Sequence, residues 1–130
     1  MRTASCSCEQ LKVRCAGEPI RISMCHCLAC QKRTGSAFAI QARWPSDRVT
    51  IEGRAQEYVR AGDEGSSATF RFCPVCGATV YWDNDTMPGM LAVPVGAFAD
   101  PSFPPPQVSV YGVRRHPWAI MPALTIEDLE

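Results

Sequence analysis

The sequence has no excess of charge of either sign. Its 13 lysines and arginines balance 13 aspartates and glutamates, and the pI is near 6.7. A nucleic-acid-binding domain usually carries a strongly basic face. We therefore expect no nucleic-acid partner, whereas a neutral or anionic small substrate is compatible with this composition.

Long apolar runs are also missing. No stretch approaches the roughly 18 apolar residues that a membrane helix needs, and the first residues hold no apolar segment of a signal peptide. We therefore expect no membrane partner and a cytoplasmic location. In a reducing compartment, clustered cysteines are more often metal ligands or catalytic groups than disulfides.

Helical periodicity is almost absent, and alternating apolar residues typical of strands dominate instead. Only two stretches predict helical turns: Leu28 to Arg33, ended by Gly35, and Thr125 to Leu129, with Thr125 as N-cap. We predict a mainly β fold with little helix in one domain spanning residues 1–130, since domains commonly run about 100–150 residues. Strands are predicted at residues 11–15, 20–24, 38–40, 49–51, 58–59, 70–72, 80–82, 91–93 and 108–111.

Cysteine is the residue type that carries chemical information. Seven of the eight cysteines fall into three tight clusters, and this close spacing is typical of zinc ligands. The clusters are Cys6-x-Cys8, Cys25-His26-Cys27-x-x-Cys30 and Cys73-x-x-Cys76.

The first and last clusters predict one closed metal site. Cys73 and Cys76 flank a turn that Pro74 favours, and Gly77 can adopt the positive φ that points backbone amides at the sulfur atoms. Two further ligands are needed, and Cys6-x-Cys8 can supply them, because residues i and i+2 of a strand point the same way. Four protein ligands are typical of a structural zinc site.

The middle cluster leaves Cys25, Cys27 and Cys30 as three thiolates with room for a fourth ligand. A catalytic zinc site keeps such an open position. The other interpretation is a second structural site completed by His26, His116 or another cysteine. Spacing alone does not decide between the two.

Several residues near the cysteines are further candidates. Lys32 and Arg33 follow the middle cluster and are hypothesised to pair with a substrate carboxylate; a charged surface turn is the alternative. Residues 114–118 form a second basic and aromatic patch, either at a pocket mouth or at a strand end with Trp118 in the core. Cys15 shares an apolar strand face, which favours a buried structural role.

The ordered set of motifs resembles the glutathione-dependent formaldehyde-activating enzyme (GFA)/centromere protein V family. The resemblance covers nearly the whole chain and implies a β-tent fold of coiled antiparallel sheets, similar to the zinc-bearing fold of methionine sulfoxide reductase B. The matching residues are Cys6, Cys8, Cys25, Cys27, Cys30, Gly35, Ser36, Phe38, Phe72, Cys73, Cys76, Gly77 and Trp118.

The resemblance also implies two zinc ions per chain and a reaction. A structural zinc would use Cys6, Cys8, Cys73 and Cys76, and a catalytic zinc would use Cys25, Cys27 and Cys30. The family's reaction joins formaldehyde to glutathione as S-hydroxymethylglutathione, a reversible carbon–sulfur lyase step. We therefore expect an enzyme acting on a small thiol or thiol adduct, with glutathione as a co-substrate; a non-catalytic two-zinc binding or chaperone module is the alternative.

Overall fold

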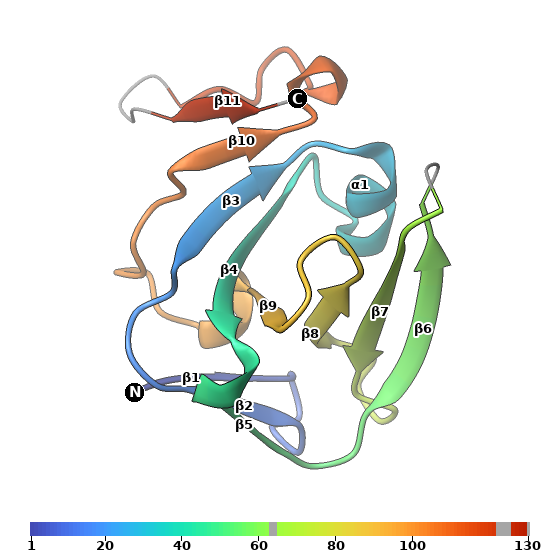
Figure 1. Ribbon diagram of the computed structural model, residues 1–130, viewed down its shortest axis with the longest axis vertical. Helices are drawn as coiled ribbons and strands as arrows, with labels where there is room; N and C mark the ends of the chain where they lie inside the picture. The colour runs from blue at the N-terminus through green and yellow to red at the C-terminus, as the bar shows by residue number, and fades with distance from the viewer. Residues whose placement is uncertain (63–64, 122–125, 130) are drawn as a thin grey trace.

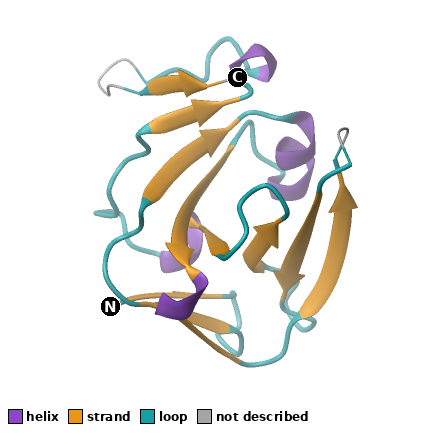
Figure 2. Ribbon diagram, viewed as in Figure 1, coloured by secondary structure: helices purple, strands orange, loops and turns teal. Residues whose placement is uncertain are grey.

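The computed structural model of the protein describes residues 1–62, 65–121 and 126–129, and strands are its most abundant secondary structure (Figures 1 and 2). Within these ranges, helix is limited to α1 (Leu28–Thr34) and the short 3-10 turns η1 (Ser46–Arg48), η2 (Val95–Phe98) and η3 (Gly112–Arg114). No helix in these ranges is long and apolar enough to cross a membrane. The strands are β1 (Arg2–Ser5), β2 (Lys12–Cys15), β3 (Arg21–Cys25), β4 (Ala39–Pro45), β5 (Val49–Glu52), β6 (Gln56–Ala61), β7 (Ser67–Phe72), β8 (Thr79–Asn84), β9 (Met90–Pro94), β10 (Val108–Val110) and β11 (Glu127–Leu129).

The mainly β fold predicted from the sequence is confirmed, and each of the nine predicted strands overlaps an observed one. The strands β1 and β11 were not predicted. The helical turn predicted at the end of the chain is wrong for the part described, because Glu127–Leu129 forms β11 and pairs in parallel with β10. Thr125, its predicted N-cap, lies outside the described residues.

The strands form two open sheets. A small sheet has the order β1-β2-β5, and a larger one has the order β11-β10-β3-β4-β9-β8-β7-β6. Neighbours are antiparallel except at β10, which pairs in parallel with both β3 and β11. Figure 1 shows the small sheet at one end of the molecule, with the β6–β7 pair and the β3–β4 pair far apart across the larger sheet.

The main core fills the space on one face of β3 and β4. Ile22, Ala42 and Trp44 point to this face. They join Val13 of the small sheet and Leu11, which directly precedes β2, and all five are at most 2% exposed. The Trp44 indole N–H donates to the Gly17 carbonyl at 3.1 Å, so its polar atom is satisfied inside the core. Burial of these side chains holds the two sheets together. Each large apolar residue contributes about 1.5–3 kcal/mol to the free energy of folding.

Alternation sends the remaining residues of β3 and β4 to the opposite face. Arg21, Ser23 and Cys25 of β3 lie on this face, as do Gln41 and Arg43 of β4. The β3–β4 pair is therefore apolar on one face and polar on the other. The polar face lines a cavity and contributes the first residue of the three-cysteine cluster.

The helix α1 is fixed by local signals at both ends. Cys27 is its N-cap, and the Cys27 sulfur accepts the Cys30 amide at 3.2 Å. Gly35 closes it in the left-handed region at φ 68°, donating its N–H to the Gln31 carbonyl at 2.8 Å. The predicted helical segment is therefore confirmed, and the helix brings Cys30 back toward Cys27.

Candidate functional site

The four cysteines of the predicted closed site come together. Cys6, Cys8, Cys73 and Cys76 have sulfur atoms that all lie within 4.8 Å of one another. The sulfur of Cys8 is 3.6 Å from those of Cys6 and Cys73, far beyond the roughly 2.0 Å of a disulfide. A tetrahedron with metal–sulfur bonds of about 2.3 Å has edges of about 3.8 Å, so the set fits one metal ion.

Backbone and side-chain N–H groups prepare the Cys73 sulfur to act as a thiolate. The Cys73 sulfur accepts the Gln10 amide at 3.0 Å and the Val75 amide at 3.3 Å. Burial raises the pKa of Cys73, but these donors and the Cys76 amide outweigh burial and lower the pKa to about 6. Gly77 adopts φ 80°, as the turn requires, and donates to the Cys73 carbonyl.

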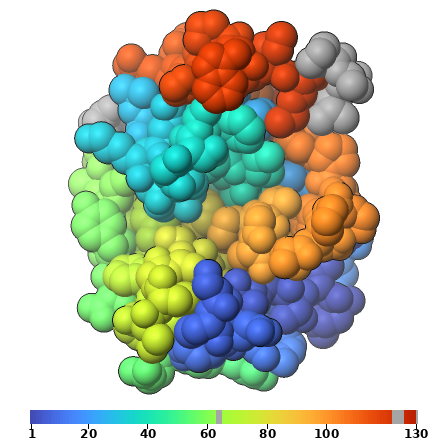
Figure 3. Space-filling view, turned by 180° about the vertical axis from the view of Figure 1, so that it is seen from behind, coloured from blue at the N-terminus to red at the C-terminus, as the bar shows by residue number. Residues whose placement is uncertain are grey.

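The halves of this cluster are more than sixty residues apart in the sequence. Figure 3 shows the N-terminal segment, in blue, directly against the yellow segment that follows β7. The cluster thus joins the small sheet to the β7–β8 turn. A metal bound here would cross-link two distant parts of the chain.

The three remaining clustered cysteines form a second group. The sulfur atoms of Cys25, Cys27 and Cys30 also lie within 4.8 Å of one another, and no fourth cysteine, histidine or carboxylate in the described part of the chain joins them. Cys25 is the last residue of β3, and Cys27 and Cys30 come from the start of α1. This group could hold a metal ion through three ligands.

The pKa values of two thiols in this group are shifted in opposite directions. Hydrogen bonds from Cys25 and Cys27 hold the pKa of Cys30 well below its usual range, and the guanidinium groups of Arg33 and Arg60 add to this effect. The pKa of Cys25 is raised in turn by its bonds to Cys27 and Cys30 and by burial. A metal ion bound to these sulfur atoms would favour the thiolate form of all three.

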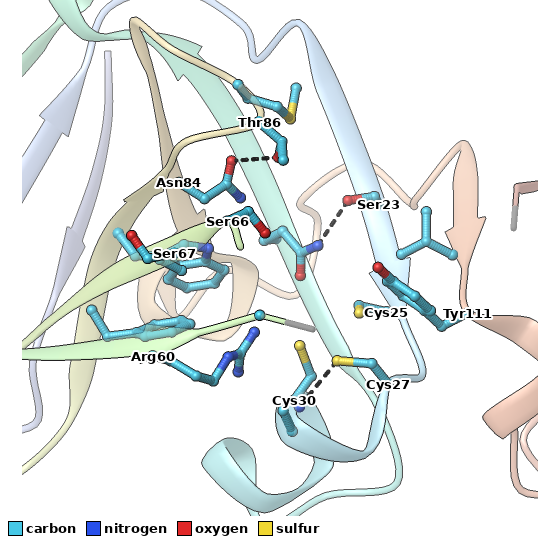
Figure 4. Close-up of a pocket in the computed structure, with 18 of the residues that line it drawn as sticks. Ser23, Cys25, Cys27, Cys30, Arg60, Ser66, Ser67, Asn84, Thr86 and Tyr111 are labelled. Atoms are coloured by element: carbon cyan, nitrogen blue, oxygen red, sulfur yellow. Dashed lines mark hydrogen bonds between the residues drawn. The ribbon is translucent and has the colours of Figure 1, made fainter. Parts of the chain in front are cut away.

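The three-cysteine cluster opens into a cavity of about 490 Å³. Figure 4 shows the three cysteine side chains turned toward one another at one side of the cavity, with Arg60 reaching toward Cys30. Phe70 and Trp82 give the cavity an apolar wall. The four-cysteine cluster lines no part of this cavity, so the two cysteine groups differ in access as well as in ligand number.

Positive charge gathers around the cavity. Arg21, Arg43, Arg60 and Arg114 line it, and no acidic residue within the described ranges does. None of these four arginines forms an ion pair with a described residue, because the observed ion pairs use other arginines. Sequence spacing did not single out Arg21, Arg43 or Arg60, although Arg21 and Cys25 have the i, i+4 relation that places strand residues on one face.

Two residues predicted to contact substrate lie elsewhere. Lys32 and Arg33 are on α1 but do not line the cavity that holds the three cysteines. The Arg33 guanidinium carbon lies 4.4 Å from the Trp82 ring centroid and 5.1 Å from that of Phe70. Arg33 therefore lies behind the aromatic wall and does not line the cavity. Its positive charge lowers the pKa of Cys30.

Neither histidine joins the three-cysteine cluster. His26 is fully buried, with its ring centroid 6.0 Å from that of Phe38. His116 Nε2 is 2.9 Å from Gln31 Oε1, and Gln31 Nε2 donates to the carbonyls of His26 and Arg114. Gln31 thus ties α1 to the segment that follows β10.

The other candidates divide between core and surface. Cys15 is fully buried in the main core, where burial raises its pKa to about 12, so its thiol is a poor nucleophile at neutral pH. Trp118 is 70% exposed, so the interpretation that placed it in the core is wrong. Arg114 lines the cavity, which agrees with the interpretation that residues 114–118 lie at a pocket mouth.

Similarity to solved structures supports the fold. A crystal structure of a Rhodobacter sphaeroides protein from a structural genomics programme matches with a TM-score of 0.57 and 20% identity, over 73% of this chain and 85% of that chain. At this identity the likeness shows the fold alone. Comparison with curated proteins finds no match to this chain.

A family match covers most of the sequence. Residues 1–114 match the family described as "Glutathione-dependent formaldehyde-activating enzyme". The matched part contains both cysteine groups and every described residue that lines the cavity. The chain therefore belongs to the glutathione-dependent formaldehyde-activating enzyme family.

Proposed function

We propose that the protein is a zinc-dependent, carbon–sulfur lyase-like enzyme acting on a thiol adduct such as S-hydroxymethylglutathione. The observation that carries the proposal is that three cysteines, with no fourth ligand among the described residues, open into a cavity of about 490 Å³ lined by unpaired arginines. The catalytic zinc uses Cys25, Cys27 and Cys30, and the structural zinc uses Cys6, Cys8, Cys73 and Cys76.

The donor set suits zinc, because thiolate groups with tetrahedral spacing are typical zinc ligands. When bound at an open position, zinc stabilises the thiolate form of a substrate sulfur at neutral pH. Three cysteine thiolates make the site negative, and Arg33 and Arg60 act on Cys30 from nearby. These two cations offset the negative charge and favour the approach of an anionic substrate.

The reaction requires that the adduct is held in position and that the negative charge left on its sulfur is stabilised. In the cleavage direction, the carbon–sulfur bond breaks and its electron pair stays on sulfur. The hydroxyl oxygen of the adduct loses its proton as the carbonyl of formaldehyde forms, and the released thiol gains one proton. Phe70 and Trp82 give the cavity in which the adduct would bind an apolar wall.

The charge of the cavity supports a carboxylate-bearing thiol such as glutathione. We assign carboxylate binding to the arginines of the cavity rather than to Lys32 and Arg33, which lie outside it. The partner is then a small-molecule thiol or its adduct. A cytoplasmic location agrees with this proposal, since glutathione acts there as the thiol buffer.

The test is exchange between glutathione and formaldehyde, followed by NMR exchange spectroscopy on the zinc-loaded protein. We expect the wild type to accelerate exchange. The Cys27→Ser variant should fold and lose the acceleration, because it removes one of three ligands at the open site. Zinc content separates the sites, with two ions expected in the wild type and one in the variant.

A wild type that binds both zinc ions, folds and does not accelerate exchange would contradict the proposal. That result favours a non-catalytic two-zinc binding or chaperone module. Such a module also predicts that both ions resist mild chelation and that Cys27→Ser unfolds the protein. The enzyme proposal predicts instead that the ion at the three-cysteine site is removed first.

A further inference from the structure

The polar face of β3 and β4 forms an ordered row of side chains. In the register of the two strands, Cys25 faces Ala39, Ser23 faces Gln41, and Arg21 faces Arg43. All of these except Ala39 line the cavity. The row therefore starts at the three-cysteine cluster, passes an amide and ends at two arginines.

The arginines at the end of the row lack a counter-charge. Arg43 is only 8% exposed, and its Nε and Nη1 atoms are buried without a hydrogen-bond partner among the described residues. The Nε atom of Arg21 is buried and unpartnered in the same way. Facing like charges on paired strands repel each other. Burial lowers the pKa of Arg43, and the charge of Arg21 lowers it further.

The amide in the middle of the row offers an acceptor. Gln41 Nε2 donates to the Ser23 hydroxyl at 2.9 Å. Gln41 is 4% exposed, and its Oε1 atom has no donor among the described residues. Buried polar groups are nearly always hydrogen-bonded. An N–H group from a bound molecule would satisfy this oxygen.

We infer that Arg21 and Arg43 bind the carboxylate of the substrate while Gln41 accepts an N–H from the same molecule. The inference rests on the proposed function for the position of the substrate sulfur. Arg21 and Cys25 are four residues apart, so their Cα atoms are about 13 Å apart along the strand. The site therefore selects a peptide-like thiol, with an amide between sulfur and carboxylate, over a short thiol acid.

The test measures binding rather than catalysis. The probe is S-methylglutathione, which keeps the carboxylates and amides but has no free thiol, and the method is isothermal titration calorimetry with zinc-loaded protein. Arg43→Met should weaken binding by about 10- to 100-fold, because hydrogen bonds to charged groups are the stronger class. Arg54→Met is the matched control, since Arg54 is exposed and does not line the cavity.

A second variant keeps the test decisive if Arg43→Met does not fold. Arg21→Met should weaken binding of the same probe, and the diester of S-methylglutathione should bind the wild type as weakly as the acid binds the variants. Binding that is unchanged in both arginine variants would overturn the inference. So would a wild type that does not bind S-methylglutathione at millimolar concentration.

These results are separate from those that test the reaction. Exchange activity in a protein whose arginine variants bind the probe normally would leave the proposed function standing and remove the subsite. Arginine-dependent binding without exchange activity would keep the subsite and remove the lyase proposal.

Discussion

Replacing Arg43 with methionine should make the ligand-free protein more stable, although it weakens binding. Arg43 is 8% exposed and faces Arg21 across the β3–β4 pair, and two nitrogen atoms of its guanidinium are buried without partners among the described residues. A buried charge without a partner opposes folding, because water solvates it better than the folded chain does. Methionine fills a similar length of space with no charge.

The magnitude follows from two contributions. Replacing buried charged groups with apolar residues of similar volume often stabilises a protein by about 1–4 kcal/mol. Removing a like-charged pair of facing strand residues adds about 0.2–1 kcal/mol. The attraction of Arg43 to Cys25 and Cys30 opposes both contributions. We therefore expect a gain of about 1–2 kcal/mol, which for a chain of this size raises Tm by about 3–8 °C.

The assay is urea denaturation at fixed zinc content, because a metal bound to the folded state shifts the apparent stability. The midpoint should rise for Arg43→Met at an unchanged slope. Arg54→Met, at an exposed site, should change the free energy of unfolding by less than about 0.5 kcal/mol. A lower midpoint for Arg43→Met alone would refute the reasoning, since it would show that the folded chain already compensates this charge.

Three further predictions test other parts of the molecule. Cys73→Ser should prevent stable folding, because it leaves the proposed structural zinc site with three ligands. Cys27→Ser should instead lose one zinc ion and keep the fold. Circular dichroism measures the folding of each variant, and zinc analysis measures its metal content. Gly35→Ala should cost about 1–2 kcal/mol in urea denaturation, because Gly35 ends α1 at φ 68°, where a Cβ is unfavourable even though space is open around it. Cys15 should react slowly with iodoacetamide at pH 8 in the zinc-loaded protein, since burial holds it as a thiol with a pKa of about 12; fast labelling of Cys15 in the folded state, detected by mass spectrometry, would contradict its placement in the core.

The sequence predicted what depends on near neighbours. The helix after Cys27 was found because the short run from Leu28 to Arg33 is followed closely by Gly35, which ends it. The nine predicted strands follow from alternation, which is also local. By contrast, the strand β11 was taken for a helical turn, because its pairing with β10 is made between segments that are distant along the chain.

In the candidate site too, features set by near neighbours could be predicted and features set by distant segments could not. Both cysteine groups could be predicted, because each half of a group carries its own short spacing and only the pairing of Cys6-x-Cys8 with Cys73-x-x-Cys76 had to be inferred. The cavity could not, because its walls come from β3, β4, β7 and β8, brought together by sheet order. Lys32 and Arg33 were chosen for nearness in sequence, but helix geometry points Arg33 behind the aromatic wall.

The balance of charge in the whole chain conceals an imbalance at the site. Of the eleven arginines, four form ion pairs with acidic side chains, and four others line the cavity without such a partner among the described residues. The first set is Arg2, Arg14, Arg71 and Arg115, and the second is Arg21, Arg43, Arg60 and Arg114. A net charge of zero therefore does not exclude strong local attraction for an anion. Attraction of an anion depends on which cations the fold leaves unpaired, and here those cations line the cavity into which the three-cysteine cluster opens.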